Sequence, residues 1–256
     1  MNVLPMQIRQ PLSAFVSQVE SVRELLVFDQ FVLEQVVGGL VQIADGLERR
    51  NLHNDAMTVR NRLDALKNIR TSGSLRPRYQ TIFNQCIVLL VSYFGSTVGD
   101  LFRSAIDVSL ASGLDVPVAK ESVETDWETL SQSTTGHSSL VARLVVSKQK
   151  ITFQDMGGTV RAFDKNLGLQ LRRGEVMNDI ILGQAARHAI VHAGAIIDGQ
   201  MKHQVRSAEP RSLKVTLVEG QPLCFTPEEV NRLADQMIAF VTDIIEQVAR
   251  SLRLPG

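Results

Sequence analysis

The sequence predicts a mainly helical protein, and three observations support this. A length of 256 residues with 44% apolar content is enough for a buried core and excludes a disordered chain. Apolar residues recur at three- and four-residue spacing along most of the chain, which is the pattern of amphipathic helices. The alternating pattern of a strand is clear only over residues 213–218. We therefore expect a helical bundle with a small β-hairpin before its last helix.

The first part of the chain is predicted to be a helical extension. Residues 12–50 carry helical spacing and are expected to form two helices, with the second bent or interrupted at Gly38 and Gly39. A third helix is expected over residues 55–70. We assign residues 1–75 to this extension.

Residues 76–256 are expected to form the main helical domain. Its most apolar stretch, residues 82–94, predicts a central helix that is buried on nearly all sides. The acidic, Ser/Thr-rich stretch at residues 113–136 predicts a loop, with a possible short helix around Trp127. Further helices are expected at residues 140–146, within 151–171, at 175–193 and at 227–249.

The C-terminal part contains the predicted hairpin and a clear helix start. Residues 213–218 and 223–225 are expected to pair as strands across a Gly-Gln-Pro turn. Thr226 then suits an N-cap position, Pro227 suits the first helical position, and two acids follow in the first turn.

Composition limits the class of partner. A net charge of zero argues against a protein coated in basic charge, but residues 139–220 hold twelve Lys and Arg against seven Asp and Glu. No run approaches the roughly 18 apolar residues of a membrane span, so we expect a cytoplasmic protein without a membrane partner. Cys86 and Cys224 have no paired spacing and are expected to be small buried side chains.

The stretch RHAIVHAG, residues 187–194, concentrates two of the five histidines beside an arginine. His188 and His192 are four residues apart and share a helix face, separated by about 40°. Arg187 and His192 are separated by about 140° on a straight helix. A bend at the helix end, or two such helices meeting across a two-fold axis, would bring them together.

Three interpretations of this stretch compete. Histidines at i and i+4 can chelate a metal ion, but only Asp198 lies near enough in sequence to join them. A structural role is also open, with a buried His and with Arg187 paired to a carboxylate. The third is metal-free acid/base chemistry on a phosphodiester, because His192 lies where the helix dipole favours imidazolium and Arg187 suits phosphate oxygens.

The segment Arg187-His188-Ala189-Ile190-Val191-His192 resembles the Arg-x4-His signature of the HEPN family. Ala193, Gly194 and Asp198 stand where that family has a small residue, a glycine and an acid. Residues 151–154, Phe163, residues 167–169 and the start of the last helix at residues 225–230 also resemble the RiboL-PSP and MAE-type branches. The resemblance covers roughly residues 76–252.

The resemblance implies a helical bundle that dimerises with the motif helices face to face. It implies a metal-independent endoribonuclease, often a toxin or effector in bacterial anti-phage defence, in which the RNA 2′-hydroxyl attacks and a cyclic phosphate is left. By resemblance, Arg187 binds and stabilises the phosphate, His192 transfers protons and His188 orients the substrate. Expected partners are RNA, a second copy of the chain and an antitoxin or defence protein, with no cofactor and no metal.

Basic side chains near the motif are expected to bind the RNA substrate, namely Arg172, Arg173 and Lys202. The sequence departs from the family at two places. His188 replaces the usual Asn, and the acid that relatives carry near Gly95 is missing, with Asp100 and Arg103 as possible substitutes. Position 194 is Gly, as in the common form of the motif, so the tyrosine that some relatives modify just after the motif is missing and that regulation is not expected. The alternative function is a catalytically silent HEPN-like module that binds RNA, a nucleotide or a protein.

Overall fold

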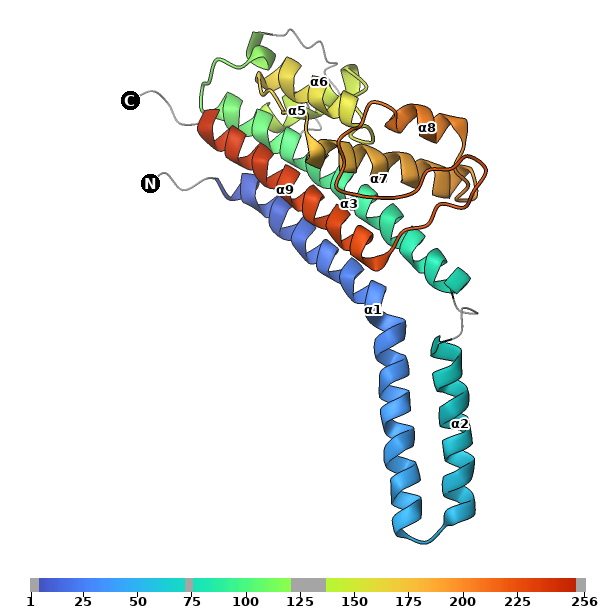
Figure 1. Ribbon diagram of the computed structural model, residues 1–256. Helices are drawn as coiled ribbons and strands as arrows, with labels where there is room; N and C mark the ends of the chain where they lie inside the picture. The colour runs from blue at the N-terminus through green and yellow to red at the C-terminus, as the bar shows by residue number, and fades with distance from the viewer. Residues whose placement is uncertain (1–4, 72–75, 121–136, 252–256) are drawn as a thin grey trace.

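The computed structural model describes residues 5–71, 76–120 and 137–251, and within these ranges it is helical without a strand (Figure 1). The expected mainly helical fold is confirmed. The helices, in chain order, are α1 (Met6–Arg49), α2 (His53–Thr71), α3 (Arg76–Ala111), the 3-10 helix η2 (Pro117–Lys120), α5 (His137–Lys148), α6 (Met156–Leu167), α7 (Glu175–His192), α8 (Gly199–Val205) and α9 (Pro227–Ser251).

The core is built around α3, as its apolar sequence predicted. Phe94 and Phe102 of α3 are fully buried, and α3 contacts α1, α5, α7 and α9. The ring of Phe94 packs between Phe15 of α1 and Phe240 of α9, with centroids 6.3 and 5.8 Å away. The first part of α1 therefore belongs to the main core, while the division into domains at residue 75 stays a prediction.

The helix α1 is continuous through Gly38 and Gly39, so the predicted second helix in this region is wrong. A Cβ added at either glycine would meet nothing within 4 Å, so no neighbouring group forces the chain out of helical geometry. A glycine in a helix interior lowers helix stability by about 1 kcal/mol relative to alanine, and the long regular stretches on both sides offset this loss.

Beyond the bundle, the second part of α1 and the whole of α2 form a projecting hairpin (Figure 1). The two helices bury few side chains in this hairpin, and most of these are small, as Ala44 and Ala56 are; Leu63 is also buried. Many large apolar side chains of this region are more than a third exposed, namely Leu25, Val27, Phe28, Phe31, Val32, Val36, Val41, Ile43, Leu52 and Met57. An exposed apolar surface of this kind is typical of an interaction site.

Residues at the helix ends cap α6 and α9, and the predicted start of α9 is confirmed. The side chain of Asp155 caps α6 by accepting a hydrogen bond from the Gly158 amide, and Gly168 ends the helix at φ 67°. The Thr226 hydroxyl accepts from the Glu229 amide while the Glu229 carboxylate accepts from the Thr226 amide, which is a capping box at the start of α9.

The β-hairpin expected at residues 213–225 is absent from the described part of the chain, where the only bridge outside helices joins Ile196 and Pro222. The alternation has a different cause: Leu213 and Val215 are buried against the helices while Lys214 and Thr216 are exposed. The amides of Ser212 and Leu213 donate to the carboxylate of Asp179 rather than to a strand partner.

Three further predictions have mixed outcomes. Cys86 is fully buried, and burial raises the pKa of its thiol to about 11, whereas Cys224 is exposed because it lies on the outward side of an extended segment. The predicted loop at residues 113–136 begins with a turn at Gly113, where φ is 67°, and contains the short helix η2. Residues 121–136, with Trp127, lie outside the described residues. Within the described residues, the segment Tyr79–Ala111 is long and apolar enough to span a membrane, yet half of its most apolar window is buried in the core.

Candidate functional site

The motif helix α7 is fixed in the bundle by buried contacts along its first half. Asn178 donates to the carbonyl of Pro210, and Asp179 accepts from the backbone of residues 212 and 213. Gly183 lets α9 approach, because a Cβ there would lie 2.9 Å from a methyl of Leu233. These contacts set the direction in which the last two turns of α7 present their side chains.

The end of α7 carries the three motif residues, and their exposure to solvent increases toward the end of the helix. Arg187 and His188 are half-buried, and His192 is exposed in the last turn. The rings of His188 and His192 lie with centroids 4.8 Å apart, so the shared face that their spacing predicted is confirmed. Gly194 follows at φ 61°, just after the end of the helix that was expected over residues 175–193.

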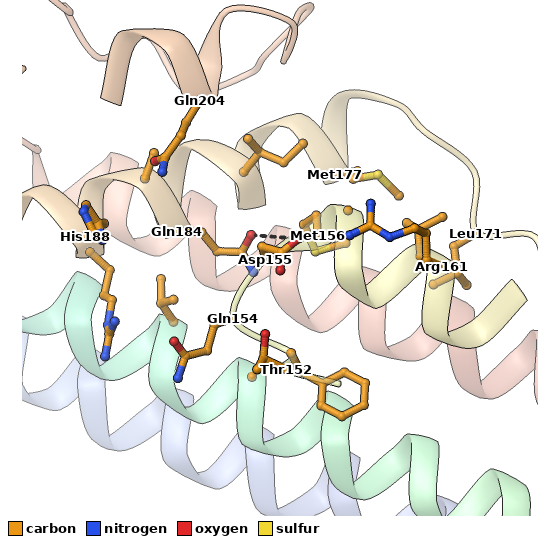
Figure 2. Close-up of a pocket in the computed structure, with 18 of the residues that line it drawn as sticks. Thr152, Gln154, Asp155, Met156, Arg161, Leu171, Met177, Gln184, His188 and Gln204 are labelled. Atoms are coloured by element: carbon orange, nitrogen blue, oxygen red, sulfur yellow. Dashed lines mark hydrogen bonds between the residues drawn. The ribbon is translucent and has the colours of Figure 1, made fainter. Parts of the chain in front are cut away.

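A cavity of about 970 Å³ opens beside this helix end. Its walls come from α3, the segment 152–155, α6, residues 171–173, α7 and α8 (Figure 2). Arg187 and His188 line it, whereas His192 does not. The structure therefore brings Arg187 and His188 to one cavity and leaves His192 beside His188.

The charged side chains that line the cavity are mostly basic: Arg161, Arg173 and Arg187 against the single carboxylate of Asp155. Asp155 is already used as the N-cap of α6. Within the residues that the structure describes, Arg161 and Arg187 make no ion pair and no hydrogen bond. Two guanidinium groups with unused donors therefore line one open cavity, which favours an anionic ligand.

Gln184 lies in the wall of the cavity, one helical turn before His188 (Figure 2). Its Oε1 accepts a hydrogen bond from the Met156 amide at 3.0 Å. Its Nε2 is buried and has no partner among the described groups. Sequence reasoning missed both Gln184 and Arg161; the four-residue spacing from Gln184 to His188 was the available signal for the first, and nothing marked the second.

The three basic residues predicted to bind substrate take different positions. Arg173 lines the cavity, where its guanidinium donates to the Ser207 hydroxyl at 3.0 Å and to the Ser207 carbonyl. Arg172 is exposed and does not line the cavity. Lys202 forms an ion pair with Glu219 at 3.1 Å and lines a separate, smaller hollow of about 410 Å³.

No group of three or more His, Cys, Asp or Glu side chains in the described ranges is arranged to hold a metal ion. Asp198, the only acid that the sequence offered to the histidine pair, caps α8 by accepting from the Met201 amide at 2.7 Å. Asp100 and Arg103 pair with each other at 2.6 Å and do not line the cavity.

Gly95 of α3 lies against the segment 152–155. A Cβ at this position would lie 3.1 Å from the backbone oxygen of Phe153, so the segment that forms one wall of the cavity packs where a side chain would stand.

Comparison of the chain with models of known families, with curated proteins and with solved structures found no match. The chemistry of the site therefore has to follow from its own residues. These are a partly buried arginine, two neighbouring imidazoles and a cavity with a basic lining. Such a set can bind a phosphate group and move protons near it.

Proposed function

We propose that this protein is a metal-independent endoribonuclease of the HEPN type that cleaves single-stranded RNA. The observation that carries the proposal is the grouping of Arg187 and His188 on a basic cavity, with the ring of His192 4.8 Å from that of His188. Single-stranded RNA suits this site because its phosphates and 2′-hydroxyls are accessible without opening a duplex.

The proposed reaction needs no external reactant. The 2′-hydroxyl oxygen attacks the adjacent phosphorus and loses its proton to one imidazole, while the bond from phosphorus to the 5′-oxygen breaks and that oxygen gains a proton from an imidazolium. The products are a 2′,3′-cyclic phosphate and a 5′-hydroxyl. Two imidazoles in contact can divide these transfers, and His192 at the negative end of the α7 dipole is suited to the acid role.

Arg187 is assigned to the charge that develops on the phosphoryl oxygens. Its guanidinium is permanently charged and planar, and it makes no ion pair with the described carboxylates that would have to be broken first. Its half-buried position strengthens its attraction to a phosphate relative to a fully solvated arginine.

One observation favours the alternative of a catalytically silent binding module. His192 does not line the cavity, so a ligand held by Arg187 and His188 need not reach it. In that case the same basic cavity would bind RNA or a nucleotide without cleaving it.

Cleavage of RNA in the presence of EDTA tests the proposal. The purified protein is expected to cut a single-stranded RNA and leave cyclic phosphate ends, and His192→Ala and Arg187→Ala are each expected to reduce the rate by at least 100-fold. Exposed residues of α2 provide matched controls, His53→Ala and Arg62→Ala, which should cut like the wild type. Binding without cleavage by the wild type would establish the silent module, and cleavage that needs added magnesium would exclude this mechanism.

The proposal extends to partners and setting. We propose a cytoplasmic toxin or defence effector that acts as a homodimer, with an antitoxin or defence protein as a further partner. Two features support association with a second copy. The projecting hairpin exposes a large apolar surface, and Val191 and Ile196 are exposed at the end of α7, where two motif helices would meet.

A further inference from the structure

We infer that the cavity beside α7 holds one nucleotide of the RNA together with both of its flanking phosphates, and that Arg161 and Gln184 are binding residues for it. The inference rests on the proposed function only in taking this nucleotide to be part of an RNA chain. Neither residue belongs to the Arg-x4-His motif.

The size and walls of the cavity suit a nucleotide. Its volume of about 970 Å³ lies within the range of cavities that enclose small ligands. Apolar side chains from several segments line it, namely Met156, Val160, Leu171, Met177 and Ile181. A flat, weakly hydrated base can lie against such a wall, while the sugar and phosphates remain near polar groups.

The cationic groups are distributed along the cavity rather than gathered at one point. Figure 2 shows His188 at one end, Arg161 at the opposite end and Gln184 between them. Arg187 lies next to His188 in the sequence and lines the same cavity. A site with a cation at each end and a hydrogen-bond donor in the middle matches a nucleoside with a phosphate on each side.

The two guanidinium groups are free to bind these phosphates. Neither Arg161 nor Arg187 has an ion pair or hydrogen bond to the described residues, and the one carboxylate in the wall, Asp155, is held by the α6 N-terminus. Arg173 contributes further positive charge but is anchored to Ser207. A phosphate at Arg161 would therefore gain a charge-assisted hydrogen bond without breaking an existing one.

The side-chain amide of Gln184 would supply the contact in the middle after a small shift, because its nitrogen is closed to solvent in this structure. A buried N–H donor without an acceptor costs free energy, and such groups in proteins are normally paired. Because Oε1 is fixed by the Met156 amide, Nε2 has a defined direction and cannot exchange places with it without losing that bond. All four bases carry carbonyl or ring-nitrogen acceptors, so this contact is expected to hold the base rather than to select one.

Calorimetric titration with nucleoside 3′,5′-bisphosphates, in EDTA at pH 8, tests the inference. The wild type is expected to bind the bisphosphate at least 10-fold more tightly than the matching 5′-monophosphate, because one cationic end is unused by the latter. Arg161→Ala is expected to lower affinity for the bisphosphate at least 10-fold and to bring it close to that for the monophosphate. Arg62→Ala, on the exposed surface of α2, is the control and should bind like the wild type.

Gln184→Met tests a binding role apart from a structural one. It removes the donor without adding a charge, so affinity should fall at least 10-fold while the melting temperature stays within a few degrees of the wild type. Gln184→Glu keeps an acceptor for the Met156 amide but adds a carboxylate that also repels phosphate, so its affinity should fall further. Wild-type affinity in Arg161→Ala or in Gln184→Met would overturn the inference, as would no binding by the wild type.

The outcomes separate this inference from the nuclease proposal. Bisphosphate binding that depends on Arg161 and Gln184, in a protein that never cleaves RNA, would support the cavity site and reject the nuclease. Cleavage of RNA that depends on His192 but is indifferent to Arg161 and Gln184 would support the nuclease and reject this use of the cavity.

Discussion

Asp107 of α3 is a partly buried carboxyl that lowers the stability of the folded protein when it is charged. It is half-buried, and its Oδ1 has no hydrogen-bond partner among the described groups. Burial raises the pKa of this carboxyl, and the nearby charges of Arg143 and Arg103 oppose the rise without cancelling it. The folded protein therefore holds this proton more tightly than the unfolded chain does.

The sign of this pKa shift gives a prediction for Asp107→Asn. A carboxyl whose pKa is higher in the folded state stabilises the fold at low pH, and that contribution is lost as the pH rises through the raised pKa. Removing the charge should therefore raise the melting temperature at pH 7 by roughly 1–2 °C, a small gain because the group is partly solvated. The gain should shrink as the pH is lowered through this range. Thermal unfolding of both proteins at several pH values measures this, with the exposed Asp64→Asn as a control that should show no such trend.

At the scale of the helices, most of the fold could be predicted because the signals are local. A 3.6-residue apolar period and the capping residues around α6, α7 and α9 act within a few residues of each other. The hairpin prediction for residues 213–225 was wrong because an alternating apolar pattern shows only that one side of an extended segment is buried. Here that side packs against helices, and the amides of Ser212 and Leu213 donate to the carboxylate of Asp179 instead of to a second strand.

The candidate site could be predicted only where it lies on one helix. The shared face of His188 and His192 follows from their spacing alone. Gln184 lies on the same helix, and its four-residue spacing to His188 was a usable signal, whereas Arg161 reaches the site only through a cavity whose walls come from segments that are far apart in the sequence. No local pattern gives such a juxtaposition. Arg172 and Lys202, which were expected to bind the substrate, do not line this cavity, and their substrate-binding role stays a prediction.

Two helical glycines should respond in opposite ways to alanine, although both lie inside long helices. At Gly38 a Cβ meets nothing within 4 Å, so Gly38→Ala should stabilise the protein by about 0.5–1 kcal/mol through helix propensity. At Gly95 the Cβ would lie 3.1 Å from the Phe153 carbonyl oxygen, and this contact should cost about 1–3 kcal/mol and cancel or reverse the same gain. Urea unfolding followed by circular dichroism measures both.

Gly95→Ala should also affect the cavity, because the segment that has to move forms one of its walls. A several-fold loss of bisphosphate affinity is expected for Gly95→Ala and none for Gly38→Ala. Equal stability and equal affinity in the two variants would show that the segment at Phe153 is free to shift and that its position does not shape the site.

For the whole molecule, the main division is between the bundle, which holds the core and the cavity, and the hairpin that projects from it (Figure 1). The bundle end of α1 is tied in by Phe15, Val19 and Val22, and by an ion pair from Arg23 to Asp235 of α9. The hairpin contributes few buried side chains of its own and exposes much apolar surface. The stability of the hairpin therefore depends on whether a partner covers this apolar surface.

Replacing residues 28–75 by a flexible Gly/Ser linker tests this division. Because the bundle keeps its α1 contacts, we expect the shortened protein to remain folded, with a melting temperature within several degrees of the wild type and with bisphosphate binding intact. Because the exposed apolar surface is removed, we expect light scattering to show a shift from dimer to monomer. A shortened protein that unfolds would mean that the hairpin is part of the cooperative core. One that stays dimeric would place the contact between copies elsewhere, with the exposed end of α7 as the next surface to test by Val191→Asp.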